Sequence, residues 1–63
     1  MQKNAHGYTK DASTALKQAV ENLKQALQTV EKDDNRNLIQ ESLQSVQSAY
    51  DQTSNTVDVL GQK

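Results

Sequence analysis

Few side chains of this sequence could hold a metal ion. His6 is the single histidine and there is no cysteine, so a transition-metal site would need ligands from several copies of the chain. Asp33 and Asp34 are adjacent, but the alternating Asp/Asn pattern and closing Glu of a calcium-binding loop are missing around them. We therefore expect no metal site. His6 is expected to be an exposed residue near the N-terminus, and the aspartate pair to serve as turn and helix-cap residues.

The hydroxyl groups also lack the partners that catalysis needs. No histidine lies within helical reach of the five serines to activate them as nucleophiles. No glycine-rich loop is present to cradle a phosphate. Tyr8 and Tyr50 are the only aromatic residues, too few for the stacking platform of a single-strand nucleic-acid binder. The sequence predicts a protein that is not an enzyme and uses no cofactor.

Charge gives one further pattern that could bind a partner. Lysines recur every seven residues, at Lys3, Lys10, Lys17 and Lys24. This stripe would either dock an acidic protein surface or form the solvated edge of a helix, and the solvated edge is favoured. The net charge of -1 and the single arginine make nucleic acid and anionic membranes unfavourable partners.

The elements that position these residues follow from the backbone and the apolar spacing. The chain has no proline and only two glycines, Gly7 and Gly61, so residues 8–60 can be helical throughout. Thr9 is the expected N-cap of a first helix, and Gly61 the expected residue just after the last one. Apolar residues spaced alternately by four and three predict the seam of packed helices. These seam residues are Leu16, Val20, Leu23, Leu27 and Val30, followed by Ile39, Leu43, Val46, Tyr50, Val57 and Leu60.

The alternation of four-residue and three-residue spacings is interrupted between Val30 and Arg36. At this point the polar stretch 31–36 favours a turn. A reversal centred on residue 33 would place Leu27 opposite Ile39 and Leu16 opposite Tyr50. The predicted fold is therefore an all-α antiparallel two-helix hairpin, with helices at about 9–31 and 35–60. The whole chain, 1–63, would form a single domain, with 1–8 as a flexible N-terminal arm and 61–63 as a short tail. The alternative is one unbroken helix roughly 75 Å long at 1.5 Å per residue, which domain swapping could produce.

Small residues beside the seam suggest how the hairpin could be completed. They recur every seven residues on both helices, at Ala12, Ala19, Ala26, Ser42, Ala49 and Thr56. A smooth flank lets a second pair of helices approach closely, which predicts a dimeric four-helix bundle. The competing explanation is that alanine is simply the best helix former. A chain this short has a small core, so association is the expected source of added stability.

Part of the sequence resembles known proteins. Residues 14–29, TALKQAVENLKQALQT, and the Gln/Ser-rich residues 42–50 resemble short helical proteins of uncharacterised function from spore-forming Bacilli. The resemblance implies a small bacterial accessory protein with a link to sporulation, and supplies no functional residues.

The expected function is that of a small non-catalytic protein-interaction module. It would be a self-associating hairpin, an adaptor or an inhibitor that completes a helical groove of a partner. A sporulation-related or phage accessory protein would fit this description. The alternative is a peripheral membrane or nucleic-acid accessory protein that acts through the lysine stripe. No apolar run approaches the length of a membrane span, and residues 1–4 lack the apolar core of a signal peptide, so a cytoplasmic location is expected.

Overall fold

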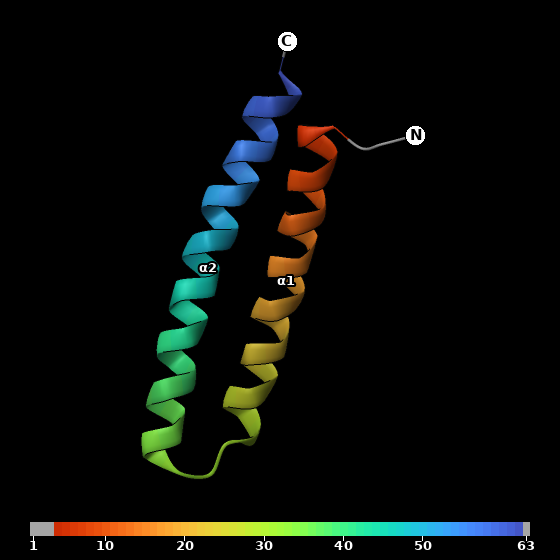
Figure 1. Ribbon diagram of the computed structural model, residues 1–63. Helices are drawn as coiled ribbons and strands as arrows, with labels where there is room; N and C mark the ends of the chain where they lie inside the picture. Colours follow the sequence, from red (N-terminus) through yellow and green to blue (C-terminus); the bar gives the residue numbers. More distant parts are fainter. Residues whose placement is uncertain (1–3, 63) are drawn as a thin grey trace.

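Two long helices joined by a short turn form the part of the chain that the computed structural model describes, residues 4–62 (Figure 1). Helix α1 spans Ala5–Thr29 and helix α2 spans Asp33–Gly61. The two helices run antiparallel and pack along their length, in a molecule with extents of 48 × 21 × 12 Å. The predicted all-α helical hairpin is confirmed, and the chain does not form the unbroken helix that was its alternative.

Helix α1 begins at Ala5 because Asn4, and not Thr9, is its N-cap. The Asn4 Oδ1 atom accepts a hydrogen bond of 2.9 Å from the backbone N–H of Gly7, which would otherwise lack a partner at the helix start. The Thr9 hydroxyl instead donates to the backbone carbonyl of Ala5 at 2.7 Å. The expectation for Thr9 was wrong, and residues 5–8 of the expected arm belong to the helix. Residues 1–3 lie outside the described residues.

The turn consists of Val30, Glu31 and Lys32, so the chain reverses earlier than the stretch 31–36 suggested. Asp33 and Asp34 stand in the first turn of α2, where the helix dipole favours negative charge. No described residue has a positive φ angle, so the turn does not require glycine.

The open end of the hairpin brings the helix termini together. Gly61 is the last residue of α2 and Gln62 is its C-cap, so Gly61 is not the residue after the helix that the sequence suggested. The imidazole of His6 packs against Gly61 so closely that an added Cβ would lie 3.2 Å from His6 Nε2. Of the expected tail, Lys63 lies outside the described residues.

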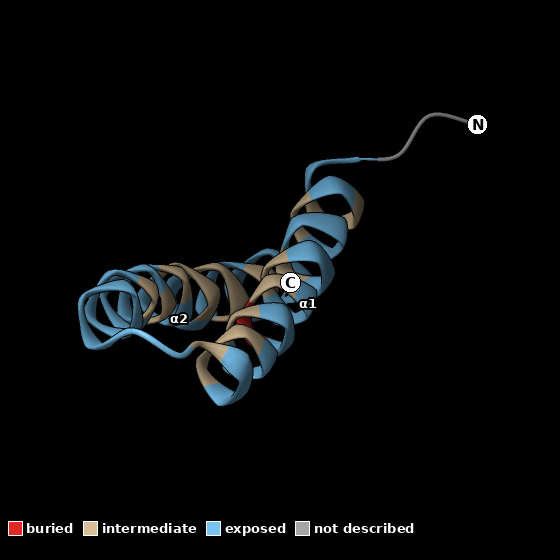
Figure 2. Ribbon diagram, turned by 90° about the horizontal axis from the view of Figure 1, so that it is seen from below, coloured by how far each residue is buried: buried red, intermediate tan, exposed pale blue. Residues whose placement is uncertain are grey.

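The core between the helices is thin. Val20, with 6% of its surface exposed, is the one buried residue among those described. Figure 2 shows that most of the inner surface is only half-buried. The half-buried apolar residues of the seam are Leu16, Leu23, Leu27, Val30, Ile39, Leu43, Val46, Tyr50 and Val57. Leu60 was expected in the seam but is 39% exposed, because it lies at the open end, where α1 begins only at Ala5 and covers it less.

Candidate functional site: two faces of the hairpin

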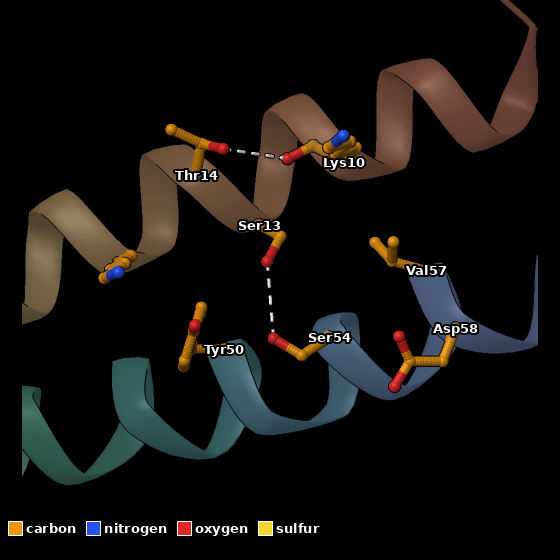
Figure 3. A pocket seen from close by; sticks show the side chains of 8 residues that line it. Lys10, Ser13, Thr14, Tyr50, Ser54, Val57 and Asp58 are labelled. Atoms are coloured by element: carbon orange, nitrogen blue, oxygen red, sulfur yellow. Dashed lines mark hydrogen bonds between the residues drawn. The ribbon is translucent and has the colours of Figure 1, made fainter. Parts of the chain in front are cut away.

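The hairpin has one broad face that carries charge. Lys10 and Lys17 of α1 line a surface hollow together with Ser54 and Asp58 of α2 (Figure 3), so these rows of the two helices lie on the same side of the seam. At seven-residue spacing the same rows hold Lys24 and further polar residues. We call this side the lysine face. Lys3, the first member of the predicted stripe, lies outside the described residues.

The opposite face carries no charge among the described residues. It consists of the predicted small-residue stripe and of the next row outward on each helix, found by the same seven-residue spacing. We call it the uncharged face. From α1 it contains Tyr8, Ala12, Ala15, Ala19, Asn22, Ala26 and Thr29, and from α2 it contains Leu38, Ser42, Ser45, Ala49, Gln52, Thr56 and Val59.

Burial divides the predicted stripe into two sets. Ala19, Ala26 and Ala49 are half-buried beside the seam. The other three residues, Ala12, Ser42 and Thr56, are exposed. The stripe thus forms a shallow strip of small side chains along the hairpin, and none of its residues is fully covered within a single chain.

Large apolar side chains flank this strip. Tyr8, Leu38 and Val59 are 61%, 62% and 57% exposed, and each lies in the outer row of the uncharged face. Leu38 is near the turn, whereas Tyr8 and Val59 are near the open end. The sequence prediction omitted these three residues. The same seven-residue spacing, applied to the next row outward on each helix, would have identified them.

The hollow on the lysine face has a volume of about 300 Å³. It is lined by Lys10, Ser13, Thr14, Lys17, Tyr50, Ser54, Val57 and Asp58. Figure 3 shows the hydroxyls of Ser13 and Ser54 pointing toward each other across the helices, with their oxygen atoms 3.3 Å apart. The Thr14 hydroxyl donates to the carbonyl of Lys10 at 3.2 Å. From the sequence this flank was expected only to be solvated. The hollow was not predicted, because it is formed by residues of both helices.

Within residues 4–62, no group of three or more His, Asp or Glu side chains is placed to hold a metal ion. No helix in the same range is both long and apolar enough to cross a membrane.

Comparison with known proteins adds no relative. No protein-family model, curated protein or solved structure matches the chain. The resemblance to short helical proteins of spore-forming Bacilli therefore stays a prediction.

Proposed function

We propose that this chain is a small non-catalytic protein-interaction module whose first partner is a second copy of itself. Two hairpins would pack through their uncharged faces into a dimeric four-helix bundle. The observation that carries the proposal is the thin core: only Val20 is buried among the described residues, while the rest of the apolar seam is half-buried. Such a hairpin gains stability when a second pair of helices covers the seam.

The uncharged face is the better of the two faces for this contact. Burying an unpaired lysine or carboxylate costs free energy, and the rows of the uncharged face contain neither. Small side chains such as Ala19 and Ala49 let helices approach closely. The exposed side chains of Tyr8, Leu38 and Val59 would gain cover at the margins of the contact.

The size and symmetry of the hairpin also suit a second copy. Its extents of 48 and 21 Å offer a face large enough for the roughly 800 Å² that each partner buries in a stable interface. A twofold dimer requires one patch that is complementary to itself. A face without charge meets this requirement, since it brings no like charges together.

The test is to place charge on the uncharged face. Ala19→Glu combined with Ala49→Glu should dissociate the dimer, because two carboxylates per chain would be buried in a closely packed contact. Gln28→Glu combined with Gln44→Glu is the matched control, since it adds the same charge at exposed positions on the other side of the seam. Light scattering coupled to size-exclusion chromatography gives the mass of each variant, and circular dichroism gives its helicity. A wild-type chain that stays monomeric and fully helical at high concentration would contradict the proposal.

Salt concentration separates this function from the membrane or nucleic-acid alternative. Association through the uncharged face should persist at high salt, because it depends on apolar burial. Binding to DNA or anionic vesicles through Lys10, Lys17 and Lys24 should weaken steeply with salt. Titrating the chain with both probes at low and high salt decides between the two functions.

A further inference from the structure

The hollow on the lysine face has a composition that the packing of the helices does not require. Across most of the hairpin the seam pairs apolar residues, but here Ser13 and Ser54 face each other. Their oxygen atoms are 3.3 Å apart, beyond the roughly 2.7–2.8 Å typical of a hydrogen bond between hydroxyls. The two hydroxyls are therefore close enough to share a third polar partner and are only weakly bonded to each other.

Two cations flank this pair of hydroxyls. Lys10 and Lys17 both line the hollow, and seven residues of helix separate them by about 10 Å along α1, with Ser13 and Thr14 between them. The flexible side chain of lysine lets each ammonium group turn toward a point between the two. Because the two ammonium groups are positively charged, the acceptor that suits them best is negatively charged, and an oxyanion can also accept hydrogen bonds from both hydroxyls.

The rest of the wall combines the acidic Asp58 with an apolar part. The side chains of Tyr50 and Val57 line the hollow beside the hydroxyls (Figure 3). The volume of about 300 Å³ is at the lower end of the range for small-molecule sites and exceeds what a single oxyanion fills. A ligand could therefore direct its anionic head at Lys10 and Lys17 and rest a compact apolar body on Tyr50 and Val57.

We propose that this hollow binds a small organic oxyanion, a carboxylate or phosphate monoester that carries a compact apolar body. The site lies on the face opposite the proposed dimer contact, so it stays open whether or not the chain dimerises. Asp58, at the edge of the hollow, opposes the anion and limits its affinity.

The test uses phenyl phosphate, benzoate and inorganic phosphate as probes, with benzyl alcohol as the neutral analogue. Each is titrated into the ¹⁵N-labelled full chain and followed by NMR. Phenyl phosphate and benzoate should give saturable shifts centred on Ser13, Thr14, Tyr50 and Ser54, whereas inorganic phosphate should bind more weakly because it lacks the apolar body. Shifts that grow without saturation and spread to the other lysines, or equal shifts with benzyl alcohol, would overturn the proposal.

Two double variants distinguish a local binding site from a general attraction of the anionic probe to positive charge. Lys10→Gln with Lys17→Gln should weaken phenyl phosphate binding about tenfold, while Lys24→Gln with Lys32→Gln removes the same charge outside the hollow and should leave it unchanged. An equal loss in both pairs would overturn the proposal.

Removing the charge of Asp58, the acidic residue that lines the hollow, should have the opposite effect on the affinity for the probe. Asp58→Asn removes the opposing carboxylate and should strengthen phenyl phosphate binding about threefold. Asp51 stands one heptad earlier on α2 and does not line the hollow, so Asp51→Asn should have no comparable effect. Equal strengthening by the two variants would show that only net charge matters and would contradict a local site. Helicity by circular dichroism confirms that each variant is folded.

Discussion

The guanidinium of Arg36 donates a hydrogen bond of 3.3 Å to the backbone carbonyl of Leu27, nine residues earlier in the chain. A second bond, of 3.5 Å, reaches the carbonyl of Val30. The last carbonyls of a helix have no partner within the helix, and they lie at the negative end of its dipole. Arg36 of α2 therefore completes the C-terminus of α1 and ties the two helices together across the turn.

Arg36→Gln should lower the free energy of unfolding by about 1 kcal/mol, because it removes these contacts from an exposed position. Urea unfolding followed by circular dichroism measures the change. Lys32→Gln, in the turn that precedes α2, is the control and should change stability by much less. Equal losses in both variants would indicate a general effect of charge near the turn.

Asn4→Ala should cost about 1 kcal/mol, since it removes the side-chain cap of α1. Asn4→Asp should preserve most of the stability, because aspartate caps the helix with the same geometry. Circular dichroism measures the helicity, and urea unfolding measures the stability. If Asn4→Ala leaves both unchanged, α1 begins beyond Tyr8 in solution.

Val20→Ala should destabilise the hairpin by about 1–3 kcal/mol, because Val20 is the buried residue between the helices. Leu38→Ala removes a larger side chain from a position that is 62% exposed, and in the monomer it should cost less than about 0.5 kcal/mol. Both variants are compared at concentrations too low for dimers. A larger loss for Leu38→Ala would place the core elsewhere.

Ser13→Cys combined with Ser54→Cys should form a disulfide within one chain, since the two side chains already meet across the helices. Mild oxidation followed by non-reducing electrophoresis and mass spectrometry identifies the product. Ser13→Cys with Ser48→Cys is the control and should not close, because Ser48 is exposed on the outer side of α2. Disulfides found only between chains would show a domain-swapped dimer.

Gly61→Ala should stabilise the hairpin by about 0.5 kcal/mol, because Gly61 is helical without a positive φ angle and alanine reduces the freedom of the unfolded chain. The new methyl group meets the end of the His6 side chain at 3.2 Å, and the ring must move slightly. Thermal unfolding of Gly61→Ala, alone and with His6→Ala, measures both contributions. A loss of stability that His6→Ala relieves would show that the ring cannot move.

The spacing of the apolar residues predicted packed helices, and the break in that spacing at the polar stretch 31–36 predicted the reversal between them. The helix ends were harder to predict. Asn4 and Thr9 are both residue types that cap helices, and only the bond from Gly7 to Asn4 distinguishes them. Asp33 and Asp34 fit a turn or the first turn of a helix equally well by composition.

The candidate sites depended on arrangements that spacing in one helix does not show. The stripe through Ala19 and Ala49 followed directly from seven-residue spacing. The hollow did not, because it depends on how far α2 is shifted along α1. Its lining side chains come from both helices, and spacing within one helix does not show that the hydroxyls of Ser13 and Ser54 lie 3.3 Å apart.

The seam also changes in character along its length, and this bears on the order of folding. Leucine and isoleucine pack next to the three-residue turn, whereas the half toward the open end also contains half-buried polar residues, Thr9, Ser13 and Thr53, beside Leu16, Tyr50 and Val57. Contacts beside the turn close a short loop, but the pair Ser13 and Ser54 is separated by 41 residues. The transition state for folding should therefore contain the turn and the layer of Leu23 and Leu43, with φ-values falling toward the termini. Amide hydrogens near the open end should exchange with solvent first, through fraying that leaves the turn region intact.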